Sequence, residues 1–425
     1  MAHFASALNI RQELFTTNQP PSEEELKVVD AKLARLREEH ALLTLRLAEM
    51  ERMSPYLVSI RHPMRILPDD ILTLIFEYAT PWCFADGVGE DSFPSPDPMG
   101  SGLGPPWTLS HVCKNWRAIC LSRPHLWSTL RIANAAGVYR SAQKIDTIFQ
   151  RSEPLPLRLY ITEMVPPTIL PLVLGTAFRW RCLYADPAHV GLSGKNNHFF
   201  PSLTHLALDL SESPTMSAAY IVAPCLHSLD LHDGFSTSAS LLRLPWEQIK
   251  RYKAVNTTSF EILLQGMRNL EELIINEDAK EEEELYTGTV LRPRISLAKL
   301  RYLEYESEFG SDSLTRLVNQ CVNMESLRTL VIVNRSREYH VVPLERSLPS
   351  VLELSLSFGD ADGVREFLGA APNVQSLHFE FNGSEVEDLE SMLLCPTTTT
   401  ERPTAAGLRQ LKHLSFTLHP SSKFL

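Results

Sequence analysis

The sequence has no window of about 18 uninterrupted apolar residues, the length that a membrane-spanning helix requires. Its start, MAHFASALNIRQELF, lacks the basic and apolar regions of a secretory signal. The seven cysteines are odd in number and scattered, which suits reduced thiols better than disulfides. Basic residues are outnumbered, 40 against 51 acidic ones, so the net charge is −11. We therefore expect a cytoplasmic or nuclear protein that binds neither membranes nor nucleic acid.

Motifs that would indicate catalysis are also absent. The sequence contains no G-x-x-x-x-G-K-[ST] phosphate loop, no G-x-G-x-x-G, no G-x-S-x-G and no H-E-x-x-H. His111, Cys113 and Cys120 could suggest a metal site, but no paired C-x-x-C spacing supports it, and we expect Cys113 on the apolar face of a helix. Titratable residues are spread along the chain, whereas an enzyme concentrates them in one pocket. We expect no catalytic residue, metal or cofactor; a hydrolase hidden among repeats would need a pocket of perturbed side chains.

Residues 1–21 have no sustained hydrophobic periodicity and end in two prolines, so we expect a flexible tail. Ser22 and Glu25 then form a capping-box pattern, in which each side chain accepts a hydrogen bond from the backbone of the other residue. This pattern predicts the start of a helix over residues 22–54, and Pro55 predicts its end.

The predicted helix carries a heptad pattern. Apolar residues recur at alternating steps of three and four, like the a and d positions of a coiled coil, and a histidine interrupts them. This seam consists of Leu26, Val29, Leu33, Leu36, His40, Leu43, Leu47 and Met50. Two interpretations are open: an intermolecular coiled coil, which would make a homodimer through residues 22–54 possible, or a helix that folds back on its own domain.

Residues 61–132 contain two helical patterns separated by an insertion. Before the first pattern, Leu67-Pro68-Asp69-Asp70 places proline in the first turn and acids at the positive end of the helix dipole. The first apolar face consists of Ile71, Leu72, Ile75, Phe76 and Ala79. The insertion near residues 86–106 is rich in glycine, proline, serine and acids, and we expect it to be disordered. The second pattern has the spacing of one amphipathic helix and consists of Leu109, Val112, Cys113, Trp116, Ile119 and Cys120.

The series RILPDDILTLIFEYA and WTLSHVCKNWRAICLSRPHLWSTLRI resembles an F-box, in the fungal form that carries a loop between its first two helices. The Leu-Pro start, the V-C-x-x-W-R centre and the P-x-L-W end carry this resemblance. In that family, the F-box docks on a Skp-type adaptor, which connects it to a cullin–RING ubiquitin ligase. The resemblance thus implies an adaptor-binding surface made or supported by Leu67, Pro68, Ile71, Leu72, Ile75, Phe76, Leu109, Val112, Cys113 and Trp116.

From Trp180 onward, an L-x-x-L-x-L-like pattern returns ten times. The copies begin at Trp180, Leu203, Leu226, Ile249, Leu270, Leu300, Leu327, Val351, Val374 and Leu411. The nine steps from 180 to 411 average about 26 residues, within the roughly 20 to 29 residues of leucine-rich repeats. We expect an irregular leucine-rich-repeat solenoid over residues 155–425, shaped as an α/β horseshoe. Amphipathic stretches such as Leu314, Leu317, Val318 and Cys321 predict helices on its convex side.

Side chains alternate along each strand, so the residues between the buried apolar ones would face the concave side. That mixed surface suits a protein or peptide. The candidate target-binding residues are His205, Asp209, Asp230, His232, Arg251, Lys253, Glu272, Tyr302, Glu304, Glu306, His378 and Glu380. Residues 271–284 add eight acids and one lysine in fourteen positions; they suit a solvated loop or a site for a basic segment.

The predicted fold class is therefore α/β: a coiled-coil-like helix, a short helical F-box and a leucine-rich-repeat solenoid. The F-box resemblance implies the substrate-recognition subunit of a Skp–cullin–F-box ubiquitin ligase, without a catalytic site of its own. The partners would be a Skp-type adaptor, through it the cullin–RING ligase, and an unknown protein substrate. The alternative is a non-enzymatic repeat scaffold, in which the F-box-like helices only cap the open edge of the solenoid.

Overall fold

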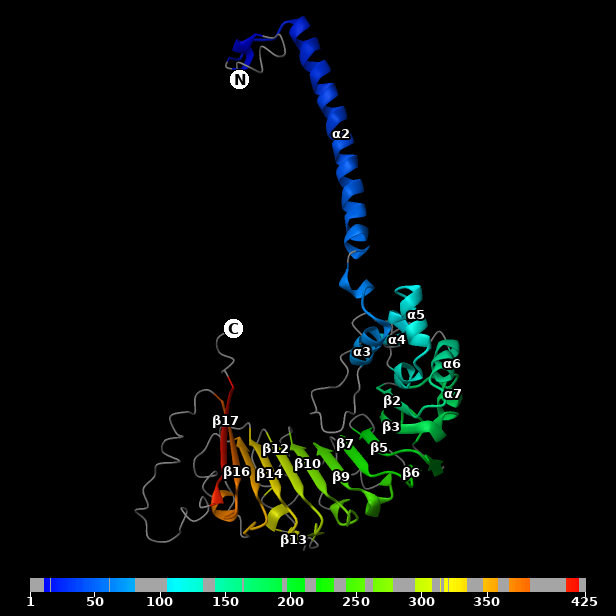
Figure 1. The fold of residues 1–425 in the computed structure, drawn as a ribbon, viewed down its shortest axis with the longest axis vertical. Coiled ribbons are helices and arrows are strands. Elements are labelled where there is room, and N and C mark those ends of the chain that lie inside the picture. Colours follow the sequence, from blue (N-terminus) through cyan, green and yellow to red (C-terminus); the bar gives the residue numbers. More distant parts are fainter. Residues whose placement is uncertain are drawn as a thin grey trace, which may run out of the picture. The chain divides into compact units, whose positions relative to one another are not determined.

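A computed structural model describes most of the chain (Figure 1). The described residues are 11–15, 17–60, 62–80, 105–132, 142–162, 164–192, 197–210, 219–232, 242–256, 263–277, 295–307, 314, 317–319, 321–334, 347–357, 367–382 and 410–419. The insertion predicted near residues 86–106 lies outside them, apart from its final two prolines. Two compact units make up the chain, Met1–Ile75 and Phe76–Leu425.

Helices make up the described part of the first unit. They are η1 (Gln12–Phe15), α2 (Glu23–Ile60), η2 (Pro63–Arg65) and α3 (Asp69–Ala79), the last of which continues into the second unit. The predicted capping box is confirmed: the N–H of Ser22 donates to Glu25 Oε2 at 2.8 Å, and the N–H of Glu25 donates to Ser22 Oγ at 3.3 Å. Arg11 also forms an ion pair with Glu25 at 2.8 Å. Part of the predicted tail is thus attached to the start of α2.

Pro55 does not end α2. The helix continues through this proline to Ile60, so its predicted end at residue 54 is wrong. Proline lacks one N–H donor and therefore removes one backbone hydrogen bond, but the other donors on both sides of it are still available to the helix. The residues after Pro55 extend the heptad pattern by a further turn.

The start of α3 agrees with the prediction for Asp69 and Asp70, but Pro68, predicted in the first turn, lies just before the helix. Asp69 and Asp70 lie in its first turn, where carboxylates favour the positive end of the helix dipole. The N–H of Leu72 donates to Pro68 O at 3.0 Å, and Thr73 Oγ1 donates to Asp69 O at 2.7 Å. Proline therefore precedes α3 as an acceptor, at a position where its missing N–H costs no helical hydrogen bond.

The second F-box-like pattern forms two short helices rather than the one predicted. α4 (Pro105–Leu109) and α5 (Lys114–Leu121) are separated by a turn. Cys113 is the N-cap of α5, and its exposed Sγ accepts a hydrogen bond from the N–H of Trp116 at 3.5 Å. The prediction that Cys113 lies on an apolar helical face is therefore wrong. The first N–H groups of a helix need acceptors from outside it, and this side chain supplies one.

The second unit is built on a parallel sheet of twelve strands among the described residues, here named the main sheet (Figure 1). Its strands lie side by side in chain order: β1 (Thr129–Ile132), β2 (Leu157–Ile161), β3 (Trp180–Ala185), β5 (His205–Asp209), β7 (Ser228–His232), β9 (Arg251–Val255), β10 (Glu272–Glu277), β12 (Tyr302–Ser307), β14 (Thr329–Asn334), β15 (Glu353–Ser357), β16 (Ser376–Asn382) and β17 (His413–His419). The stack of successive parallel strands is a solenoid. Each of the ten predicted copies supplies one strand.

The main sheet begins earlier than the sequence predicts. β1 lies inside the F-box-like segment and pairs with β2, so the boundary predicted between residues 132 and 155 falls within one continuous sheet. The short η3 helix (Pro124–Trp127) leads directly into β1, and its Trp127 is fully buried. Trp127 Nε1 donates to Cys120 O at 2.8 Å, and the ring lies 4.4 Å from the guanidinium of Arg151, so this buried tryptophan joins α5 to a residue beyond β1.

Along the chain, the strands of the main sheet are connected by segments that contain short helices and further strands. The helices are α6 (Ala142–Arg151), α7 (Leu170–Leu174), η5 (Ala177–Arg179) and η6 (Trp246–Gln248). One minor sheet contains β4 (Asn197–Phe199), β6 (Ala219–Val222) and β8 (Leu242–Arg243), and another contains β11 (Ile295–Ser296) and β13 (Cys321–Asn323). Cys321, predicted in a helix, thus begins a strand. Cys321 pairs with Ile295 of β11.

One face of the main sheet covers the hydrophobic core. Strand register aligns a buried apolar residue in nine successive repeats: Leu183, Leu206, Leu229, Tyr252, Leu273, Leu303, Leu330, Leu354 and Leu377. The tenth residue of the row, Leu414, is exposed. Full burial of each such leucine contributes about 1.5–3 kcal/mol. This row of buried side chains therefore stabilises the stacking of successive strands in the solenoid.

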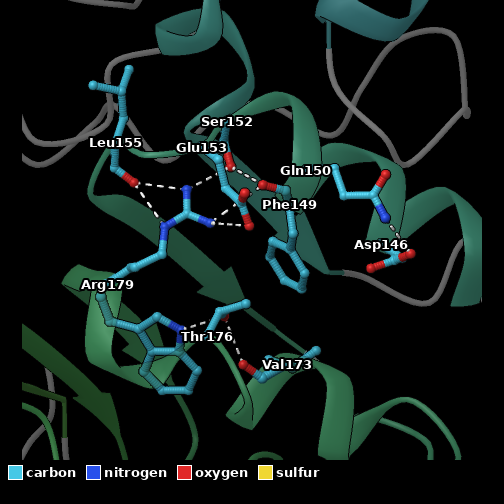
Figure 2. Close-up of polar contacts among 10 residues, drawn as sticks. Asp146, Phe149, Gln150, Ser152, Glu153, Leu155, Val173, Thr176 and Arg179 are labelled. Carbon is cyan, nitrogen blue, oxygen red and sulfur yellow. Dashed lines mark hydrogen bonds and ion pairs between the residues drawn. The ribbon is translucent and has the colours of Figure 1, made fainter.

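Arg179 connects the end of α6 to the residues just before β3 (Figure 2). Its buried guanidinium donates to Phe149 O at 3.3 Å, to Leu155 O at 2.8 Å and to Ser152 Oγ at 2.9 Å. The carboxylate of Glu153 lies 3.9 Å away. One arginine therefore donates to the carbonyl of Phe149 in the last turn of α6, where intrahelical donors are missing, and to that of Leu155 after the helix.

Replacement of Arg179 by methionine should lower the free energy of unfolding by about 1–3 kcal/mol, because buried carbonyls lose their donors. Urea denaturation of the full chain measures this change. The matched control is Arg181→Met, since Arg181 is an exposed arginine two residues further on. Equal losses in the two variants would contradict the role assigned to the Arg179 hydrogen bonds.

Candidate functional site

The main sheet has a second face, here named the polar face, which is lined by residues that alternate with the core residues. In β12, half-buried Tyr302, Glu304 and Glu306 alternate with three buried residues. All the predicted target-binding residues occupy such alternating positions on β5, β7, β9, β10, β12 and β16: His205, Asp209, Asp230, His232, Arg251, Lys253, Glu272, Tyr302, Glu304, Glu306, His378 and Glu380. The sequence pattern therefore grouped residues that share one face.

Charges concentrate in the middle of the polar face. This central cluster consists of Asp230, Arg251, Lys253, Glu272, Tyr302, Glu304 and Glu306. Register places Asp230 beside Lys253, and Arg251 beside Glu272, whose Oε1 lies 3.5 Å from Arg251 Nε. Tyr302 OH donates to Glu304 Oε2. Carboxylates outnumber cations in the cluster, so it attracts positive charge.

Lys253 is the most buried charge of the central cluster, with 7% of its surface exposed. Burial lowers the pKa of Lys253 to about 8, and the neighbouring carboxylates of Glu304 and Glu306 act in the opposite direction. A buried ammonium is costly unless carboxylates compensate it. The positive charge of buried Lys253 therefore compensates part of the negative charge of the cluster, while the carboxylates of Glu304 and Glu306 remain half exposed.

Asp230 lies next to Lys253 on the polar face. Its Oδ1 is buried and accepts no hydrogen bond from the described residues. Burial raises the pKa of Asp230 to about 6; Arg251 lowers it, and Glu272 raises it further. The charged form of this carboxylate is thus less stable in the fold than in water, which is unusual for an acid beside two cations.

Aromatic rings cover the polar face near the start of the main sheet. Tyr160 and Tyr184 stack with their ring centroids 6.3 Å apart, and His232 meets Tyr184 edge-on at 6.2 Å. Tyr184 OH donates to Asp209 Oδ2 at 3.5 Å, and burial, followed by Asp209, raises the pKa of Tyr184 to about 12. Burial also lowers the pKa of His232. The sequence analysis missed both tyrosines, although Tyr184 has the same position in its repeat as Asp230.

The other end of the polar face contains hydroxyl side chains that hydrogen-bond a histidine. His378 Nδ1 lies 2.7 Å from Ser415 Oγ, and its Nε2 lies 3.2 Å from Thr417 Oγ1. Both ring nitrogens of His378 therefore have hydroxyl partners on the neighbouring strand β17. The polar face thus changes along the solenoid from aromatic, through charged, to hydroxyl-rich.

The predicted adaptor-binding residues are divided between the two units. The first unit contains Leu67, Pro68, Ile71, Leu72 and Ile75, and the second contains Phe76, Leu109, Val112, Cys113 and Trp116. Four of these residues are exposed: Pro68, Ile71, Val112 and Cys113. Leu72 and Phe76 are buried, and the others are half-buried. In the second unit, the rings of Phe76 and Trp116 meet edge-on with centroids 4.9 Å apart.

Two general features of the described residues bear on the site. No group of three or more histidine, cysteine, aspartate or glutamate side chains among them could hold a metal ion. No helix in the described ranges is both long and apolar enough to cross a membrane.

The chain matches no protein-family model, and no curated protein matches it.

Replacement of Asp230 by asparagine should change how stability depends on pH. The pKa of Asp230 is about 6 in the folded chain, against an ordinary value of 3.8. This carboxyl therefore stabilises the fold below pH 3.8 and loses that contribution as the pH rises through 6. Relative to the parent chain, Asp230→Asn should gain roughly 2 kcal/mol of unfolding free energy between about pH 4 and pH 7.

Urea denaturation at a series of pH values measures this gain. The control is Glu380→Gln, which removes a half-buried acid from another strand of the same face. A pH-independent difference between Asp230→Asn and the parent chain would contradict the raised pKa.

Proposed function

We propose that this chain is the substrate-recognition subunit of a Skp–cullin–F-box ubiquitin ligase. Residues 61–132 act as the F-box that docks on a Skp-type adaptor. The repeats form a leucine-rich-repeat horseshoe, and its polar face binds the protein target. The chain performs no chemistry: it holds a target lysine near an activated ubiquitin, so that the transfer becomes effectively intramolecular.

The observation that carries this proposal is an exposed apolar surface at the start of α3. Ile66 exposes 84% of its surface, and Ile71 and Leu74 expose 39% and 49%. These side chains follow or flank the Leu67-Pro68 turn, which is the Leu-Pro start of the F-box resemblance. Exposed apolar side chains gathered at the start of α3, two of them on the helix and Ile66 just before it, indicate a protein interface.

The charged polar face supports the second half of the proposal. A receptor needs a surface that discriminates one protein from another, and half-exposed charges do so by excluding partners of like charge. Glu304 and Glu306 carry such charges in the middle of the polar face. Their target would offer basic or hydrogen-bonding groups at the matching positions.

A second candidate function, the repeat scaffold, is favoured by contacts within the second unit. The guanidinium of Arg151 lies 4.4 Å from the ring centroid of Trp127 and 5.3 Å from that of Trp107. These cation–π contacts join α6 to the F-box-like residues. In the scaffold, those residues serve only to cover the open edge of the main sheet.

Coexpression of the full chain with a Skp-type adaptor, followed by size-exclusion chromatography, tests the proposed function. The parent chain should elute with the adaptor as a stoichiometric complex. Ile71→Asp should abolish the complex, because a charge in an apolar interface must be desolvated. The control variant Phe178→Asp, at an apolar residue that is 61% exposed and outside the F-box-like segment, should leave the complex intact.

If the folded parent chain and the folded adaptor form no complex, the proposed receptor function is contradicted and the scaffold function remains. Equal loss of binding in both variants would contradict the assigned surface.

A further inference from the structure

The long helix α2 exposes an apolar seam, which His40 and Ser54 interrupt. Because α2 continues beyond Pro55, the next a and d positions are Ser54 and Leu57, which extend the eight predicted seam residues. Seven seam residues expose between 42% and 69% of their surface: Leu26, Leu33, Leu36, Leu43, Leu47, Met50 and Leu57. An apolar stripe of this length along a helix of 38 residues indicates a binding partner.

The spacing of the seam specifies a helical partner. Apolar residues repeat every 3.5 residues on average, which keeps them facing a second helix that winds around the first. Each a or d side chain then inserts between four side chains of the facing helix. A sheet or a loop offers no such repeated set of holes, so the seam fits another long helix.

The polar residues of the seam favour an identical helix as that partner. His40 and Ser54 both occupy a positions, whereas every d position is apolar. In a parallel dimer in register, a faces a and d faces d, so each polar residue meets its own copy. In an antiparallel dimer, a faces d, and His40 would lie against an apolar residue. A polar residue at a single a position is a known determinant of register.

Charges beside the seam are compatible with this arrangement and limit its strength. In register, Arg46 lies near Glu51 of the second copy, an attractive pair of g and e residues. Lys32 lies near Arg37 of the second copy, which is repulsive. Glu25 would face another acid, but its charge is already compensated by the ion pair with Arg11.

We propose that α2 forms a parallel, in-register coiled coil with α2 of a second copy of this chain. The resulting homodimer carries two copies of the repeat unit and would raise avidity for a multivalent target without any new contact to it. This inference goes beyond the proposed function and does not depend on adaptor binding, since all the residues involved lie in α2.

Sedimentation velocity of the full chain at micromolar concentrations tests the dimer. The parent chain should sediment with twice the mass of one chain. Leu43→Asp, at a d position, should raise the dissociation constant about a hundredfold or more. Leu42→Asp is the matched control, because Leu42 is equally exposed (59% against 56% for Leu43) but lies outside the seam. A monomeric parent chain, or equal dissociation of the two variants, would overturn the proposal.

Cysteine substitution tests the orientation. Leu43→Cys places two thiols opposite each other only in the parallel, in-register dimer, so mild oxidation should cross-link it. Leu42→Cys and the parent chain, which retain the same native cysteines, should not cross-link through α2. Cross-linking of Leu42→Cys as fast as Leu43→Cys, or a dimer in which Leu43→Cys does not cross-link, would overturn the parallel register.

Discussion

The alternation of side chains along parallel strands in register is the constraint on which the second unit depends. Leu206 lies beside Leu229, and the same position continues through the later repeats. A shift of one residue in any strand would move leucines to the polar face and charges into the core. The apolar row therefore fixes the register of every strand with its neighbours, and the polar face follows from the same register.

The electrostatics of the polar face are a consequence of this register. Asp230 and Lys253 come from different repeats and become neighbours because β7 pairs with β9 residue by residue. Their close packing removes water, which raises the pKa of the carboxyl and lowers that of the amine. Burial of these charged groups therefore costs desolvation free energy. A partner that pairs with them would offset this cost. This is the physical basis for the binding role that we propose for the polar face.

The repeated apolar pattern was sufficient to predict ten of the twelve strands of the main sheet and many residues of the polar face, because both follow from side chains that alternate along a strand. The prediction missed that β1 joins the same sheet, because its residues lie inside the F-box-like segment, although Trp127, Leu130 and Ile132 have the spacing of the repeat. The split at Cys113 was missed because a thiol N-cap is a weak sequence signal. Pro55 misled the prediction because loss of one donor does not always end a long helix. Pairings such as Arg179 with Leu155 O depend on tertiary packing alone.

The most direct test of this account compares neighbouring residues on opposite faces of one strand. Leu354 is buried in β15, and Ser355 follows it on the polar face. In urea denaturation of the full chain, Leu354→Ala should lower the unfolding free energy by about 2–5 kcal/mol, and Ser355→Ala should change it by less than about 0.5 kcal/mol. Equal effects of the two substitutions, or a larger effect at Ser355, would contradict the assignment of the two faces.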